Sequence, residues 1–154
     1  MNELAIKKGA TSYWTGEDFE VNIQKLRRII DKMELSHTVF TGHLVSQILR
    51  RRVTAFVAVL RCSPHELEKR LQNRGYGTKK VRENVLSEIL DICLFDALRR
   101  FGSDKVGEFD TTGREPAGIA KAIISVYRNE SSPRVGLVDW LKAVSESGTL
   151  SNYI

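Results

Sequence analysis

The stretch TAFVAVL, residues 54–60, constrains the fold most, because it is apolar at nearly every position. A strand with one face in water alternates apolar and polar side chains, whereas a strand covered on both faces is apolar throughout. Strands of the second kind occur in parallel sheets that have helices on both faces. We therefore expect residues 54–60 to form an inner strand of a parallel sheet.

Strands and helices alternate around this stretch. Short β-branched and aromatic segments predict further strands over residues 37–42 and 105–113. Apolar residues at helical spacing predict helices over 20–33, from 43 to about 52, and over 63–75, 78–101, 115–128 and 135–148. This alternation predicts an α/β fold with a doubly wound parallel sheet.

The helix over residues 63–75 has the clearest expected boundaries. Ser63 is the expected N-cap, Pro64 fits the first turn, and Glu66 would complete a capping box with Ser63. Gly75 is expected to end the helix, because glycine readily adopts the left-handed conformation found at helix ends. In the tail, we expect Trp140 to anchor the last helix onto the rest of the molecule.

Positive charge is concentrated in one part of the chain. Residues 50–82 hold ten Lys or Arg and only two Glu, although the net charge of the whole chain is +5. Such a cluster is typical of a surface that binds a polyanion, and equally typical of a solvated surface. For Arg50, Arg51 and Arg52 we favour a solvated surface over an RNA contact.

Cysteine usage, histidine spacing and hydropathy narrow the class of protein. Cys62 and Cys93 lie far apart inside apolar segments, which indicates buried thiols rather than a disulfide. The three histidines show no metal-ligand spacing, so we expect no metal held by side chains. No apolar run approaches the ~20 residues of a membrane span, and the start lacks the pattern of a secretory signal. We expect a cytoplasmic protein with no membrane partner.

Several short motifs follow one another in the second half of the chain. They are Val-Leu-Arg at 59–61, Arg-Gly-Tyr at 74–76, Lys-Val at 80–81, Glu-Asn-Val at 83–85 and Asp-Thr-Thr-Gly at 110–113. With these motifs the sequence resembles the archaeal-type adenylate kinases, a family that includes relatives of the coilin-interacting nuclear ATPase. The resemblance covers residues 2 to about 128.

The resemblance implies a P-loop kinase-like domain over residues 1–128, then a linker at 129–134 and a C-terminal helix and tail at 135–154. Within the domain, residues 1–23 would bind the nucleoside monophosphate. Residues 73–83 would form a short lid over the phosphates of ATP.

The family also implies an activity and site residues. The reaction is phosphoryl transfer from ATP to AMP, giving two ADP, with Mg²⁺ as a cofactor and with accompanying ATPase activity. Arg74 is implied as a catalytic and ATP-binding residue of the lid. His43, which follows Gly42 after a Walker-B-like strand, is implied as a second catalytic residue, although a purely structural role at the strand end is an equal alternative. Arg114 is implied as a contact to the adenine end of ATP.

Two departures from the family bear on this activity. Thr41 stands where the family often has an acidic residue, which weakens the assignment of a Mg²⁺-organising group to this strand end. Residues 1–154 also contain no GxxxxGK[ST] loop, whose backbone N–H groups and lysine hold phosphates. We expect the sequence to begin after the family's first strand, P-loop and first helix, and to have little phosphotransfer activity by itself.

Two other classes of function stay open at this point. One is a non-catalytic small-subunit ribosome assembly factor that binds a ribosomal protein or rRNA, because eukaryotic relatives act with a small-subunit ribosomal protein and the basic window suits RNA. The other is a generic basic α/β binding module.

Overall fold

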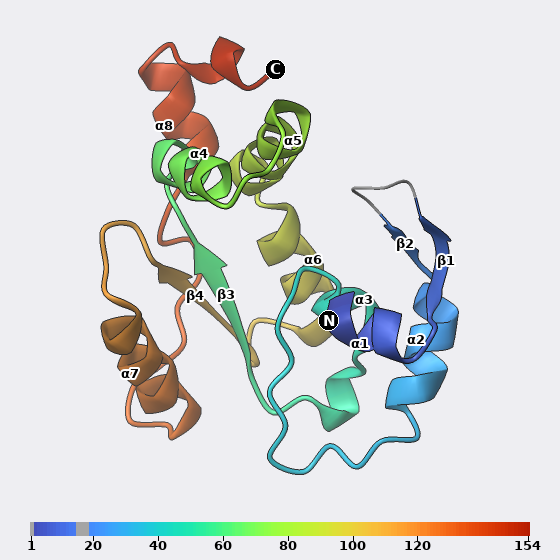
Figure 1. Ribbon diagram of the computed structural model, residues 1–154. Helices are drawn as coiled ribbons and strands as arrows, with labels where there is room; N and C mark the ends of the chain where they lie inside the picture. The colour runs from blue at the N-terminus through green and yellow to red at the C-terminus, as the bar shows by residue number, and fades with distance from the viewer. Residues whose placement is uncertain (1, 15–18) are drawn as a thin grey trace. The chain divides into compact units, whose positions relative to one another are not determined.

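The chain folds as two compact units, residues 1–55 and residues 56–154. The computed structural model, drawn in Figure 1, describes residues 2–14 and 19–154. Each unit buries its own set of apolar side chains. No helix in the two described ranges is long and apolar enough to cross a lipid bilayer.

The first unit combines short helices with one hairpin. Its elements are α1 (Asn2–Lys7), the antiparallel strands β1 (Thr11–Trp14) and β2 (Phe19–Val21), α2 (Ile23–Ile30), α3 (Val45–Ile48) and the 3₁₀ turn η1 (Arg51–Val53). Helix α2 is shorter than the expected 20–33 because Phe19–Val21 pair with β1. Its N-cap is Asn22, whose Oδ1 accepts a hydrogen bond from the backbone N–H of Lys25 at 2.9 Å.

The prediction of a strand over residues 37–42 is wrong. Residues 38–41 have no regular structure, and they lie between His37 and Gly42, whose φ angles are 52° and 132°. A strand is stabilised by hydrogen bonds to a neighbouring strand. Among the described residues no strand pairs with this segment, and Val39 is 86% exposed. This β-branched segment has no neighbouring strand among the described residues, so its backbone stays irregular.

The second unit is built on two parallel strands, β3 (Val57–Arg61) and β4 (Val106–Asp110). They run in register from Val57 opposite Val106 to Arg61 opposite Asp110, so their carboxyl ends lie together. Helices α6 (Ile92–Phe101) and α7 (Pro116–Tyr127) pack on these strands, from opposite sides in Figure 1. The predicted α/β class, a parallel sheet with flanking helices, is confirmed.

Helix α4 (Pro64–Asn73) ends as the sequence predicts. Gly75 has a φ of +78°, its N–H donates to the Gln72 carbonyl at 2.9 Å, and the N–H of Tyr76 donates to the Leu71 carbonyl at 3.2 Å. These two bonds form a Schellman motif, which satisfies carbonyls that the end of a helix leaves unpaired. The start of the helix differs from the prediction, because Ser63 makes no side-chain cap hydrogen bond.

The long helix expected over residues 78–101 is interrupted. The structure has α5 (Thr78–Ile89) and α6, separated by Leu90 and by Asp91, which takes a left-handed φ of 56°. A helix cannot continue through a left-handed residue. The break turns α6 onto the strands, while α5 packs beside α4.

The C-terminal part packs on the α4–α5 hairpin. It contains α8 (Trp140–Glu146) and the 3₁₀ turn η2 (Leu150–Asn152), both drawn in red next to α4 and α5 in Figure 1. One buried apolar cluster joins the hairpin to this part of the chain; its members are Leu71, Val81, Val85, Ile89, Val144 and Tyr153. Trp140 is packed against the cluster, so its predicted role as an anchor is confirmed.

Candidate functional site

The turn Asp110–Gly113 follows β4 and is fastened to the end of β3. Both the N–H and the Oγ1 of Thr111 donate to the carbonyl of Arg61, at 2.8 Å and 2.6 Å. Asp110 Oδ1 accepts from the N–H and the hydroxyl of Thr112, and Thr112 Oγ1 accepts from the N–H of Ser63 at 2.9 Å. α/β proteins bind ligands at this kind of place, outside the carboxyl ends of parallel strands. The turn is therefore a rigid part of a candidate ligand site.

Helix α4 holds the same turn from the other side. Glu66 Oε2 accepts from the N–H of Gly113 at 2.8 Å, and its Oε1 pairs with Arg70. Arg70 in turn donates to the Thr111 carbonyl at 3.2 Å. The sequence predicted that Glu66 would cap its own helix, but the structure uses it to hold the turn. Glu66 and Arg70 were missed as site residues because this contact joins segments more than 40 positions apart.

Beneath the turn, one buried arginine lies among three carboxylates. The Arg61 guanidinium is 1% exposed and donates to Glu88 Oε1 at 2.8 Å, to Glu108 Oε1 at 2.6 Å, and to Asp91. Glu88 Oε1 also accepts from the N–H of Cys62 at 3.2 Å and from Trp140 Nε1 at 3.0 Å. We call these residues, Arg61, Glu88, Asp91 and Glu108, the Arg61 cage. It joins both strands, the end of α5 and the start of α8.

Burial and the cage contacts shift the pKa values of Glu88 and Arg61. Burial raises the pKa of Glu88 above its ordinary value, although hydrogen bonds from Arg61, Cys62 and Trp140 act in the opposite direction. For Arg61, burial by itself lowers the pKa, but Glu88 and Asp91 outweigh it and raise the pKa, so the guanidinium stays charged. Burial also raises the pKa of the Cys62 thiol, which keeps it protonated and unreactive. We therefore assign the cage and Cys62 a structural role.

The cage had a signal in the sequence. Arg61 ends an apolar strand, and Glu108 interrupts the buried strand VGEFD. The Glu108 side chain is 0% exposed. A charge in a strand that is covered on both faces requires a partner, because an unpaired buried charge is costly. An arginine and a glutamate in neighbouring predicted strands could have been matched on this ground.

The turn between α4 and α5 lies in solvent. Residues 72–79 are all exposed, and Tyr76 is 47% exposed. Arg74 is the C-cap of α4, where its backbone N–H donates to the carbonyls of Arg70 and Leu71. Nothing lies within 4 Å of a Cβ built on Gly75 or Gly77. The hairpin thus presents Arg74, Lys79 and Arg82 on an open basic tip.

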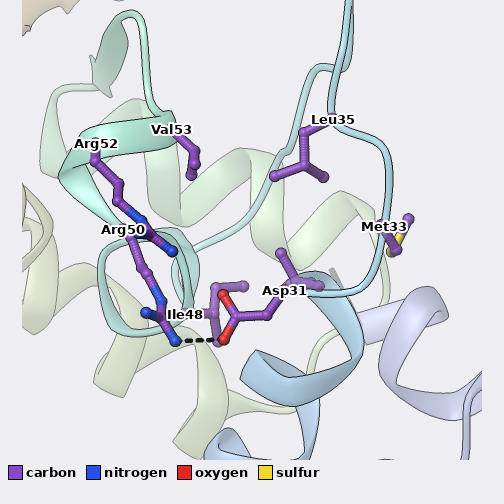
Figure 2. A pocket seen from close by; sticks show the side chains of 8 residues that line it. Asp31, Met33, Leu35, Ile48, Arg50, Arg52 and Val53 are labelled. Carbon is purple, nitrogen blue, oxygen red and sulfur yellow. Dashed lines mark hydrogen bonds and ion pairs between the residues drawn. The ribbon is translucent and has the colours of Figure 1, made fainter.

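The first unit has a pocket of about 230 Å³. Its walls are about equally polar and apolar. The polar part comes from Arg52 and from an ion pair between Arg50 Nη2 and Asp31 Oδ2 at 2.5 Å; the apolar lining residues are Ile30, Met33, Leu35, Ile48 and Val53. Figure 2 shows Arg50 and Asp31 directed toward each other at the pocket wall. The lining does not include residues 2–14 or 19–23, the described part of the expected monophosphate region 1–23.

Comparisons with known proteins match most of this chain. A family model described as AAA domain matches residues 1–91. A protein of Thermococcus onnurineus is 33% identical over 141 residues, which are 91% of this chain and 74% of the relative. A protein of Methanocaldococcus jannaschii is 35% identical over 136 residues, 87% of this chain and 71% of the relative. Both bear the name "Putative adenylate kinase". This chain belongs to the archaeal-type adenylate kinase family.

A shorter match is closer in sequence. A protein of Halobacterium salinarum with the same name is 46% identical over 84 residues, which are 54% of this chain and 50% of the relative. Membership in the archaeal-type adenylate kinase family supports a nucleotide-kinase-like function and a P-loop kinase-like fold for the chain.

The site residues that the family implies are spread over the structure. Arg74 is the C-cap of α4, whereas Arg114 follows the turn that Glu66 and Arg70 of α4 hold; the Arg114 N–H donates to the Thr111 carbonyl at 3.2 Å. His43 belongs to the first unit, where it is exposed in the turn that leads into α3. Their roles in nucleotide binding stay predictions.

Proposed function

We propose that this protein is a nucleoside-monophosphate kinase of the adenylate kinase type, which converts ATP and AMP into two ADP and also hydrolyses ATP. The observation that carries the proposal is the fastened turn Asp110–Gly113 at the carboxyl ends of β3 and β4, next to a basic helical hairpin, in a chain of the archaeal-type adenylate kinase family.

The proposal gives the exposed arginines separate tasks. Arg74, on the hairpin tip, contacts the phosphates of ATP and stabilises charge that develops during transfer, which preorganised cationic donors do in phosphoryl transfer. Arg114, beside the strand-end turn, contacts the adenine end of ATP. His43 of the first unit is the second proposed catalytic residue. Residues 1–23 bind AMP.

Mg²⁺ accompanies ATP throughout this family. Among the described residues no group of three or more His, Cys, Asp or Glu side chains could hold a metal ion, and Thr41 replaces the usual acidic residue. Asp110 is engaged by Thr112. We therefore assign no side chain of this chain to Mg²⁺ and derive no step through the ion.

The test is ADP formation from ATP and AMP, measured with a coupled assay. Because residues 1–154 contain no GxxxxGK[ST] loop, the assay uses two proteins: residues 1–154 alone, and the same residues preceded by the first strand, P-loop and first helix of an archaeal relative. We expect ADP only from the second, the P-loop-bearing chain. Rapid ADP formation by residues 1–154 alone would contradict the expectation, and an inactive P-loop-bearing chain that binds rRNA would favour the ribosome-assembly alternative.

Arg74→Ala in the P-loop-bearing chain tests the lid. We expect kcat/KM for ATP to fall by at least ~10²-fold, since a charge-assisted contact used in the transition state contributes about 3 kcal/mol. Arg74→Lys should recover only part of the loss, because an ammonium group lacks the paired donors of a guanidinium. Arg99→Ala is the control: Arg99 also lies in the last turn of a helix and is 74% exposed. An equal kcat/KM for ATP in Arg74→Ala and Arg99→Ala would show that Arg74 has no role in the ATP site.

A further inference from the structure

Residues 135–154 are not used by the proposed reaction, yet they make extensive contacts within the second unit. Val144 and Tyr153, 6% and 9% exposed, are buried in the same cluster as Leu71 of α4 and Val81, Val85 and Ile89 of α5. Leu150 and Trp140 pack on the edge of the cluster. The C-terminal segment therefore covers the apolar side of the hairpin whose tip carries Arg74.

Part of this contact involves the lid itself. The expected lid covers residues 73–83, and Val81, 4% exposed, is its buried residue in the cluster. Residues 73–79 of the tip are exposed, and among the described atoms nothing lies within 4 Å of a Cβ built on Gly75 or Gly77. A lid of this kind moves by pivoting where the chain is open and is held where the chain is packed. Here the packed part is held by the C-terminal segment.

Polar contacts tie the same segment to the Arg61 cage. Trp140 Nε1 donates to Glu88 Oε1 at 3.0 Å, and the N–H of Leu137 donates to Glu108 Oε2 at 2.8 Å. Directly before the segment, the Arg134 carbonyl accepts from the N–H of Glu108 at 2.8 Å. Glu88 belongs to α5, and Glu108 belongs to β4. The segment thus crosses from the strands to the hairpin and is fixed at both.

We propose that residues 135–154 form a strap that holds the α4–α5 hairpin against the strand-end turn, with Trp140 as its latch, and so sets how often the lid opens. The strap is defined by contacts inside the second unit. Its effect on nucleotide binding rests on the proposed function, because that effect requires the hairpin tip to be the lid over ATP.

The latch can be loosened with little change in volume. Trp140→Phe keeps an aromatic ring on the cluster but removes the Nε1–H that Glu88 accepts. Val144→Ala weakens the apolar contact and leaves the Trp140 hydrogen bond in place. Ile119→Val is the matched control, since Ile119 is 6% exposed in α7 and lies outside the hairpin cluster.

Backbone hydrogen exchange on residues 1–154 measures opening of the hairpin without any nucleotide. For Trp140→Phe and for Val144→Ala we expect exchange in α5, Thr78–Ile89, to become about tenfold faster, with little change in β4 and α7. Ile119→Val should not accelerate exchange in α5 more than in the rest of the second unit. Equal acceleration across the second unit in all three variants, or no change in α5, would overturn the strap.

ATP affinity of the P-loop-bearing chain supplies the second readout. If the strap favours the closed lid, Trp140→Phe should weaken ATP binding by roughly fivefold, because ATP then has to select a less populated state. Faster exchange in α5 with unchanged ATP affinity would support the strap but show that the hairpin is not the ATP lid. Unchanged exchange with normal ATP binding would leave the proposed function standing and reject the strap.

Discussion

At the scale of single residues, the buried guanidinium of Arg61 requires carboxylate partners to offset the loss of its hydration. It is 1% exposed, and one of its partners, Glu108, is 0% exposed. Removing one member of a buried ion pair leaves the other charge unpaired in a medium that solvates it poorly. The stability of the second unit should therefore depend strongly on this arginine.

Arg61→Met is expected to lower the free energy of unfolding by about 3–5 kcal/mol, measured by urea denaturation. Adding Glu108→Gln to this variant should recover part of the loss, because the buried carboxylate then becomes neutral. Arg99→Met, at a position 74% exposed, serves as the control and should cost little. A loss for Arg61→Met no larger than for Arg99→Met would show that the cage is not closed to water.

Glu88 makes the stability depend on pH. Burial raises its pKa in the folded state, so the folded protein binds this proton more tightly than the unfolded chain does. The stability that Glu88 contributes is present below its unfolded pKa of 4.5 and is lost as pH rises through the higher folded pKa. Glu88→Gln removes this titration. We expect the free energy of unfolding of Glu88→Gln, measured by urea denaturation at several pH values, to rise relative to that of the wild type above pH 4.5. A difference between the two free energies that is constant or falls with pH would contradict the raised pKa.

At the scale of elements, the sequence predicted those whose boundaries are set by local chemistry. Helix α4 ends as predicted because Gly75 supplies the left-handed residue of its Schellman motif. Strand β3 was recognised from its unbroken apolar run, although the expected burial on both faces is wrong, because Leu60 is 54% exposed. The strand over 37–42 was wrongly predicted and the break at Asp91 was missed, because both depend on which neighbours the rest of the chain provides. The contacts of Glu66 and Arg70 were missed for the same reason.

Two glycines in different elements should respond oppositely to the same substitution. A Cβ on Gly107 of β4 would lie 2.8 Å from Cζ of Phe56 and 3.1 Å from Cε2 of Phe109, whereas nothing lies within 4 Å of a Cβ on Gly118 of α7. Gly107→Ala should lower stability by about 1–3 kcal/mol through overpacking. Gly118→Ala should raise it by about 0.5–1 kcal/mol, because alanine favours the helix. Thermal melts of the two variants would test this, and a shift of the same sign in both would contradict it.

At the scale of the whole molecule, the edge of β3 opposite β4 is the place where we expect association with other chains. Among the described residues β3 pairs with β4 alone, and Leu60 of β3 is 54% exposed. Unpaired strand edges with exposed apolar side chains favour association with other chains.

Residues 1–154 are therefore expected to associate as their concentration rises, which sedimentation velocity over a concentration series would detect. Leu60→Lys should reduce the association, because a lysine on an edge strand is unfavourable for pairing with another chain. Val59→Ala, at a position 7% exposed on the same strand, is the control and should lower stability without reducing association. A monodisperse monomer at every concentration would contradict the expectation.

The Arg61 cage also bears on the order in which the protein acquires its structure during synthesis. Its hydrogen bonds join residues 27, 47 and 52 positions apart, the last of them reaching Trp140. Contacts between such distant positions form late, because the intervening chain must first be brought together. A nascent chain therefore exposes Arg61 and its apolar strand to water long before Trp140 has left the ribosome. The Glu88–Trp140 contact of the second unit cannot form before Trp140 has emerged, and until then its first strand is open to misfolding and to chaperones.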